Sequence, residues 1–109
     1  MWFILVPRAH GVTEIYELSV ADQNQLIKES SSIALYLKKK CLVDKVNIGA
    51  LGNIVSQLHI HVVGRTIQDV AWPGPVWGNG EAEPYSPEVL VEKINLLRDW
   101  LRAQKTLFL

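Results

Sequence analysis

The chain has 109 residues, which is enough for one domain with one hydrophobic core and too few for two. Hydrophobic residues make up 49% of it and charged residues 20%, as in an ordinary globular protein. The formal net charge is zero, so we expect no electrostatic attraction to a nucleic acid polymer or to an anionic membrane.

The chain opens on an apolar run that predicts a short buried strand over residues 3–6, ended by Pro7. The run is too short for a signal-peptide core or a membrane span, so no membrane is expected as a partner. A domain rarely begins directly in a strand. We therefore expect residues 1–109 to be a single domain that lacks the N-terminal part of the full fold.

Residues 8–18 show little periodicity and are expected to connect this strand to a helix. Ser19 has the side chain of an N-cap, and Asp22 three residues later gives a weak capping box. Apolar and small residues then recur every three or four positions, which predicts an amphipathic helix to about Lys40. Cys41 is the only cysteine, which excludes an internal disulfide and favours a reducing, cytoplasmic compartment.

Two strands are predicted next, over residues 46–50 and 57–63, with a turn signal at Gly52-Asn53 between them. Alternation is clearest in the second strand, where three apolar side chains share one face: Leu58, Ile60 and Val62. Because the loop between the two strands is short, we expect an antiparallel hairpin.

Residues 71–88 are rich in Trp, Pro and Gly, which predicts an irregular loop. Ser86-Pro87 then supplies an N-cap with proline at the first helical position, and a second helix is expected to end near Gln104. The order strand, helix, strand, strand, helix indicates the α+β fold class. Such a small sheet has exposed edges, so a homodimer formed through an edge is expected.

The second predicted strand carries the residues suited to chemistry. Gln57, His59 and His61 lie on its polar face, and the two histidines are expected roughly 6.5 to 7 Å apart along the strand. A neutral imidazole is a competent nucleophile, and its ring nitrogens bond to phosphate oxygens. We expect a carbonyl of His61 or of a neighbouring strand to orient His59 through its other ring nitrogen. Backbone N–H groups of the turn at residues 52–56 are candidates to stabilise phosphate charge.

Two other interpretations of the histidine pair remain open from the residues alone. The first is a half-exposed polar face without chemistry. The second is a metal pair, for which only His10, Cys41 and scattered carboxylates are available as further ligands.

The chain resembles the histidine triad (HIT) family, and most closely its small bacterial branch of diadenosine polyphosphate hydrolase type. The resemblance extends to about Gly78 and rests on five segments in family order: Phe3-Ile4-Leu5-Val6-Pro7-Arg8-Ala9-His10, Asn47-Ile48-Gly49, Gly52-Asn53, Gln57-Leu58-His59-Ile60-His61-Val62-Val63 and Trp72-Pro73-Gly74. It implies a HIT-like antiparallel sheet with a helix packed on it and a C-terminal helix, and requires neither a cofactor nor a metal.

The family motif is His-φ-His-φ-His-φ-φ, where φ is apolar. The resemblance implies that His59, on the central histidine, is the nucleophile that forms a nucleotidyl–histidine intermediate. His61 falls on the last histidine, which contacts phosphate oxygens in the same site. Gln57 falls on the first histidine and departs from the motif, since its amide forms hydrogen bonds but does not ionise. These three residues are the expected catalytic set.

The resemblance also implies a phosphate-binding set. Asn47 matches the phosphate-side asparagine of the family, and Gly52 matches the glycine whose backbone approaches the phosphate. Asn53 stands where many members carry Gln, and Ile54 where many carry a phosphate-binding Ser or Thr. Val55 is expected to contribute its backbone N–H.

Three tryptophans stand at positions of interest. Trp2 occupies the place where many members carry a fourth histidine. Trp72-Pro73-Gly74 is similar to the family segment that packs close to the active site. Trp72 and Trp77 are therefore candidates either to flank a base or to hold the loop in place as buried indoles.

The expected function is hydrolysis or transfer at the α-phosphate of a nucleotide conjugate: a phosphoramidate, a dinucleoside polyphosphate or an acyl adenylate. The expected partner is thus a purine nucleotide or a dinucleoside polyphosphate. One alternative is a purine-nucleotide-binding module with weak or no activity, which the departures at Gln57, Trp2 and Ile54 favour. Another is an edge-paired scaffold without a nucleotide role.

Overall fold

The computed structural model describes residues 1–104 and divides the chain into two compact units, residues 1–65 and 66–109. The first unit contains strand β1 (Trp2–Leu5), a short 3-10 helix η1 (Ile15–Glu17), helix α1 (Val20–Lys39), and strands β2 (Lys45–Gly49) and β3 (Ile60–Arg65). The second contains an irregular loop and helix α2 (Pro87–Ala103). The predicted α+β class is confirmed.

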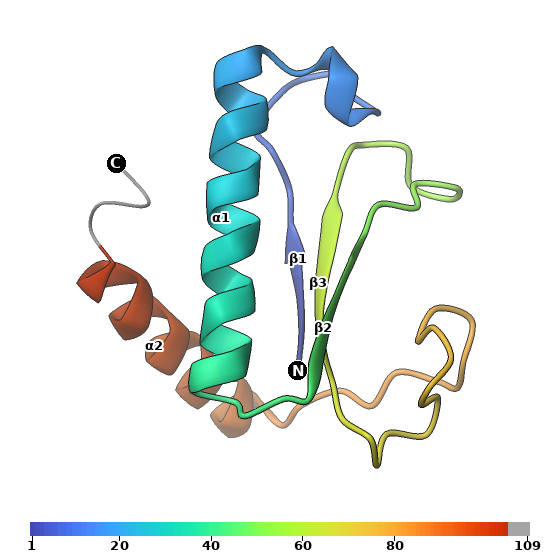
Figure 1. Cartoon of the computed structure of the whole chain (residues 1–109), viewed down its shortest axis with the longest axis vertical. Coiled ribbons are helices and arrows are strands. Elements are labelled where there is room, and N and C mark those ends of the chain that lie inside the picture. Colours follow the sequence, from blue (N-terminus) through green and yellow to red (C-terminus); the bar gives the residue numbers. More distant parts are fainter. Residues whose placement is uncertain (105–109) are drawn as a thin grey trace. The chain divides into compact units, whose positions relative to one another are not determined.

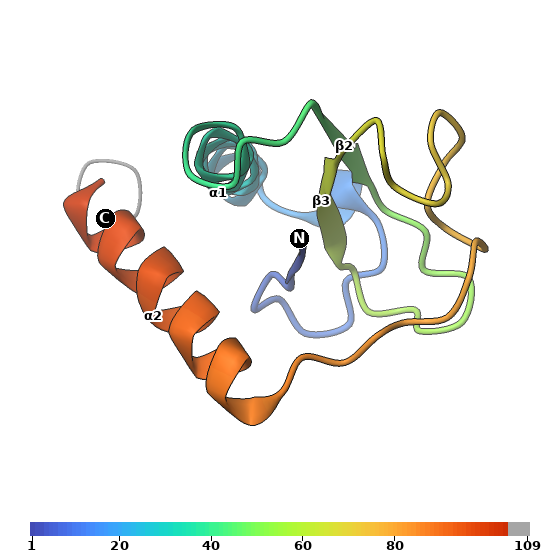
Figure 2. The same ribbon diagram turned by 90° about the horizontal axis from the view of Figure 1, so that it is seen from below.

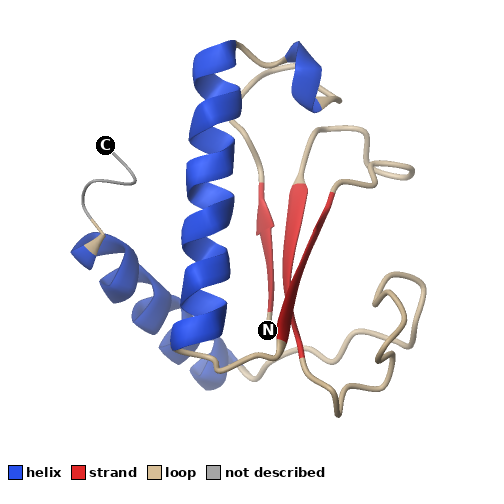
Figure 3. Ribbon diagram, viewed as in Figure 1, coloured by secondary structure: helices blue, strands red, loops and turns tan. Residues whose placement is uncertain are grey.

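The sheet has the order β1-β3-β2, and both pairings are antiparallel. Strand β3 is the central strand, and its residues Ile60 to Val63 are all buried. The expected hairpin of β2 and β3 is confirmed, with Gly49 opposite His61. Figure 3 shows the three strands side by side, with a loop closing the end of the hairpin.

The loop between β2 and β3 is longer than expected, because β3 begins at Ile60 rather than at residue 57. The reason is a lack of pairing partners. Strand β1 ends at Leu5 opposite Ile60, and β2 ends at Gly49 opposite His61. The segment before Ile60 therefore has no strand beside it, although the N–H of Leu58 donates to the carbonyl of Val12 at 2.9 Å.

Helix α1 begins and ends where the sequence predicts. The hydroxyl of Ser19 accepts a hydrogen bond from the N–H of Asp22 at 3.1 Å, and Lys40 is the C-cap. The helix covers one face of the sheet, as Figures 1 and 2 show, and buries Leu26, Ile33 and Leu37. The first unit thus has a helix layer and a sheet layer with the core between them.

The second unit confirms the predicted loop and helix. Asp69 organises the start of the loop by accepting hydrogen bonds from the N–H groups of Thr66 and Ala71 at 3.2 and 3.1 Å. Ser86 caps α2 by accepting from the N–H of Val89 at 3.4 Å, with Pro87 at the first helical position. Within residues 1–104, neither helix is long and apolar enough to pass through a bilayer.

Gly64 permits the close approach of α1 to β3. A Cβ added at this position would lie 2.7 Å from Cγ1 of Val43 and 3.1 Å from Cδ2 of Leu37. Both contacts are shorter than ordinary van der Waals distances, so a side chain there has to displace its neighbours.

We expect Gly64→Ala to lower the free energy of unfolding by about 1–3 kcal/mol through overpacking. Urea unfolding followed by circular dichroism measures this change. Val43→Ala removes the methyl group that the new Cβ would meet. We therefore expect the double variant to lose less stability than the sum of the losses in the two single variants. If Gly64→Ala were as stable as the wild type, the helix and the sheet would not be in close contact here.

Candidate active site

Two histidines lie side by side where the chain enters β3. The ring centroids of His59 and His61 are 5.1 Å apart, with 69° between the ring planes. His61 is buried, with 9% of its surface exposed, and His59, one residue before the strand, is half-buried. Side chains of an extended chain alternate, so residues two apart share a face. The expectation that one surface carries both imidazoles is confirmed.

The backbone carbonyl of Gln57 orients the ring of His59. The Gln57 oxygen lies 2.7 Å from Nδ1 of His59. A carbonyl oxygen only accepts, so in the neutral ring Nδ1 carries the proton and donates it to this bond. Nε2 then holds the free lone pair. The orienting carbonyl was expected from His61 or from a neighbouring strand; it comes instead from the residue two positions earlier, because the unpaired segment leaves that carbonyl without a strand partner.

The indole of Trp2 fixes the neutral ring of His61 as the tautomer opposite to that of His59. Nε1 of Trp2 donates to Nδ1 of His61 at 2.9 Å, and the two rings meet edge to face with centroids 5.5 Å apart. Since an indole N–H only donates, Nδ1 of His61 is the acceptor and Nε2 carries the proton in the neutral ring. The pKa of His61 is held below its ordinary value of 6.5, first by burial and second by the charge of His59.

Asn47 shares this face of the sheet and is held by Arg65. Nη1 of Arg65 donates to Oδ1 of Asn47 at 2.8 Å, and Arg65 is almost fully buried at 2% exposure. Strand pairing places Asn47 opposite Val63, between the positions of His61 and Arg65. Because its oxygen is engaged by the guanidinium, the Nδ2 amide group of Asn47 is the part that can donate to an anion.

Sequence reasoning missed Arg65, although the signal was present. The alternation that places His59 and His61 on one face continues through Val63 to Arg65. Trp2 was noted only as a departure from the family, since its contact with His61 joins residues 59 positions apart.

The loop from Ala50 to His59 does not gather its predicted phosphate-binding residues into a built site. Gly52 has a positive φ of 69°, as a turn glycine does. Asn53 is exposed, Ile54 is 98% exposed and Val55 is 63% exposed. The loop leaves β2 at Gly49, the residue opposite His61, so it starts beside the histidines and extends into solvent.

The side chain of Gln57 lines a hollow next to the segment that follows β1. Its amide donates to the carbonyl of Ala9 at 3.4 Å. The hollow has a volume of about 550 Å³, and Arg8 and His10 also line it. The two exposed side chains Arg8 and His10 thus lie near the residue whose carbonyl orients His59.

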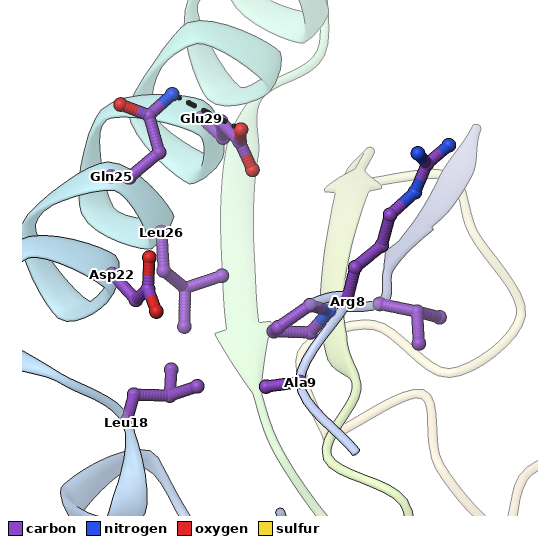
Figure 4. A pocket seen from close by; sticks show the side chains of 9 residues that line it. Arg8, Ala9, Leu18, Asp22, Gln25, Leu26 and Glu29 are labelled. Atoms are coloured by element: carbon purple, nitrogen blue, oxygen red, sulfur yellow. Dashed lines mark hydrogen bonds between the residues drawn. The ribbon is translucent and has the colours of Figure 1, made fainter.

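Two further hollows lie on the α1 side of the first unit. One, of about 340 Å³, is bounded by α1 and the segment after β1, with Arg8 and Ala9 opposite Leu26 and Glu29 (Figure 4). The other, of about 260 Å³, is mainly apolar and includes Ile27 of α1 with Ile48 of β2. Neither His59 nor His61 lines any of these three hollows.

The other candidate ligands are not brought to the pair. Within residues 1–104, no three side chains of His, Cys, Asp or Glu lie where they could hold a metal ion together. Trp72 and Trp77 belong to the second unit, so their role beside a base stays a prediction.

The lowered pKa of His61 couples its protonation to folding. Just below pH 6.5 the unfolded chain holds a proton on His61 that the folded protein does not, so stability rises with pH through this window. We expect the free energy of unfolding to fall as pH decreases from 6.5 through the folded-state pKa. Urea unfolding between pH 7 and 5 measures the effect, and His61→Gln should flatten it. His10→Gln controls for the loss of one imidazole, and an unchanged slope in His61→Gln would contradict this coupling.

Comparisons with known proteins identify the family of the chain and solved structures with a similar fold. The HIT domain family matches residues 1–67. A histidine triad (HIT) protein from Sinorhizobium meliloti 1021 is 49% identical with a TM-score of 0.81, over 84% of this chain and 67% of that one. A histidine triad protein from Marinobacter aquaeolei VT8 is 43% identical with a TM-score of 0.88, over 94% and 74%. One from Bradyrhizobium japonicum is 41% identical with a TM-score of 0.85, over 90% and 73%. No curated protein matches the chain.

Proposed function

The chain belongs to the histidine triad family, and on that premise we propose that it is a nucleotidyl hydrolase or transferase of the diadenosine polyphosphate hydrolase type. Its substrate is a purine nucleotide with a leaving group on the α-phosphate: a phosphoramidate, a second nucleotide joined through phosphates, or an acyl group. The observation that carries the proposal is the 2.7 Å bond from His59 Nδ1 to the carbonyl of Gln57, which leaves Nε2 free to attack.

In the first step, Nε2 of His59 attacks the α-phosphorus and forms a nitrogen–phosphorus bond. The bond from phosphorus to the leaving group breaks, and the leaving group departs with the electron pair; an amine leaving group takes a proton from solvent. Nδ1 keeps its proton on the Gln57 carbonyl, so the nucleotidyl–imidazole is cationic and remains easy to displace. In the second step, water attacks phosphorus and gives up one proton to solvent, the nitrogen–phosphorus bond breaks with its electron pair returning to Nε2, and a nucleoside monophosphate is released.

His61 and Asn47 stabilise the charge that grows on the phosphate oxygens. His61 offers its Nε2–H, since Trp2 occupies Nδ1. Asn47 offers its amide group, since Arg65 occupies the amide oxygen. Oriented donors of this kind need no rearrangement when charge develops, which lowers the barrier. The loop at residues 52–55 extends into solvent in the structure, and we propose that its backbone N–H groups join these donors when a phosphate binds.

We expect His59→Ala to reduce hydrolysis of adenosine phosphoramidate by at least about 10³-fold, because the remaining donors cannot replace the nucleophile. Release of adenosine monophosphate measured by chromatography gives the rate, and circular dichroism checks the fold. His10→Ala is the matched control, since it removes an exposed imidazole from the same unit. Retention of the original rate in His59→Ala would contradict the assignment of the nucleophile.

A nucleotide-binding module with little or no turnover is the second candidate function. It is favoured by Gln57, which stands in place of an ionisable histidine and whose amide is bonded to the Ala9 carbonyl. Calorimetry with adenosine monophosphate, run on the same preparation as the turnover assay, separates the two functions. Binding by the wild type without release of product would support the module.

The active form is proposed to be a homodimer joined along the edge of β2. In the described sheet β2 pairs on one side only, with β3. Ile48 of β2 is 54% exposed and lines the apolar hollow that also includes Ile27. An exposed strand edge beside apolar side chains is a surface that a second copy covers well.

We expect light scattering to give the mass of two chains for the wild type and of one chain for Ile48→Lys, because a buried lysine at the contact is costly. Val70→Lys is the control, as Val70 is 95% exposed and lies outside the first unit. A monomeric wild type would exclude the dimer, whereas a dimeric Ile48→Lys would move the interface away from this edge.

A further inference from the structure

We propose that Trp2 is a positioning residue that holds His61 as a neutral Nε2–H donor by donating its own indole N–H to Nδ1. The role of the donor in phosphate binding rests on the proposed function, but the bond itself and its effect on the ring do not. Nε1 of Trp2 lies 2.9 Å from Nδ1 of His61, within hydrogen-bond distance.

Strand pairing places the indole where it can reach the ring. On β1, Ile4 lies opposite His61 and Trp2 lies opposite Val63, so both share the histidine face of the sheet. The two rings meet edge to face at 65°, which directs the indole edge and its N–H at the imidazole. Trp2 is 41% exposed, so it acts as a side chain laid over the sheet and not as part of the core.

The indole bond makes a charged His61 unfavourable. A second proton on the ring would have to sit on Nδ1, where it would face the N–H of Trp2 instead of a lone pair. Ile4 and Gly49 lie opposite His61 on the neighbouring strands, and neither carries a charge. His59 lies next to it, and Arg65, further along the face, is bonded to Asn47.

The two histidines are therefore fixed as opposite tautomers by two different bonds. His59 gives its Nδ1 proton to the Gln57 carbonyl and keeps a lone pair on Nε2. His61 receives the Trp2 proton at Nδ1 and keeps its own proton on Nε2. Attack on phosphorus needs the lone pair, and stabilisation of the phosphate oxygens needs the donor. By fixing the tautomer of His61, Trp2 gives this histidine the donor role.

The direct test is a titration of the histidine ring nitrogens by long-range ¹H–¹⁵N correlation NMR, without substrate. We expect wild-type His61 to show Nδ1 unprotonated and Nε2 protonated. In Trp2→Phe, which keeps an aromatic ring but loses the N–H donor, we expect the His61 midpoint to rise by roughly half a unit to one unit, and its tautomers to mix. Tyr16→Phe, at an exposed side chain of η1 in the same unit, controls for the remote loss of an aromatic donor and should leave His61 unchanged.

A kinetic cycle tests whether Trp2 acts through His61. We expect Trp2→Phe to lower kcat about tenfold with little change in KM, the scale at which an orienting partner of a functional histidine matters. In a His61→Gln background, Trp2→Phe should have no further effect on kcat, because the ring that it positions is gone.

The outcomes separate this proposal from the proposed function. An unchanged His61 titration and tautomer in Trp2→Phe would overturn the positioning role, whatever the activity. Full additivity of the two substitutions in kcat would also overturn it and indicate a structural role. If the wild type turns over no nucleotide but Trp2→Phe shows the expected NMR shift, the Trp2–His61 bond is supported and only the proposed function is contradicted.

Discussion

The hydrogen bond from His59 to the carbonyl of Gln57 is the interaction on which the site depends. It joins residues two apart in the chain, at 2.7 Å, and decides which nitrogen of the ring is free. A neutral histidine without such a partner samples two tautomers. With it, the neutral ring is fixed in orientation and has its lone pair on the outer nitrogen. The bond exists because the segment before Ile60 lies beyond the ends of both neighbouring strands, so its carbonyl is available.

The rest of the first unit serves to hold this segment in place. Strand β3 runs through the centre of the sheet, and α1 covers one of its faces. Leu58, Ile60 and Val62 are almost fully buried on that side. Because these residues are anchored in the core, the side chains next to them on the other face have little freedom to move. Such rigidity suits groups that must be held close to a reacting atom. Gly64 lets the two layers come close, so the anchoring is tight where the strand passes under the helix.

The sequence predicted the parts of the site that follow from local geometry. Alternation over residues 57–63 placed His59 and His61 on one face, because two-residue periodicity holds for any extended chain. The caps at Ser19 and Ser86 were equally local and were confirmed. The start of β3 was placed three residues too early, since pairing depends on where other strands end.

Contacts between distant parts of the chain were beyond such reasoning. Trp2 and His61 meet only because β1 pairs with β3 in one register, and the sequence does not state that register. The same holds for the bond from the buried Arg65 to Asn47, which crosses from β3 to β2. The family resemblance supplied the proposed roles of His59 and His61, but the chain departs from the family at Gln57 and Trp2. Only the structure shows the hydrogen-bond partners of Gln57 and Trp2.

The most direct test of the account is detection of the covalent intermediate. The wild-type protein would be mixed with adenosine phosphoramidate, quenched in alkali to preserve phosphorus–nitrogen bonds, and digested for peptide mass mapping. The account predicts one adenylyl group, attached to the peptide region at His59 through a ring nitrogen. Attachment at His61 or His10 would contradict it, as would continued release of adenosine monophosphate with no adenylyl group on the protein.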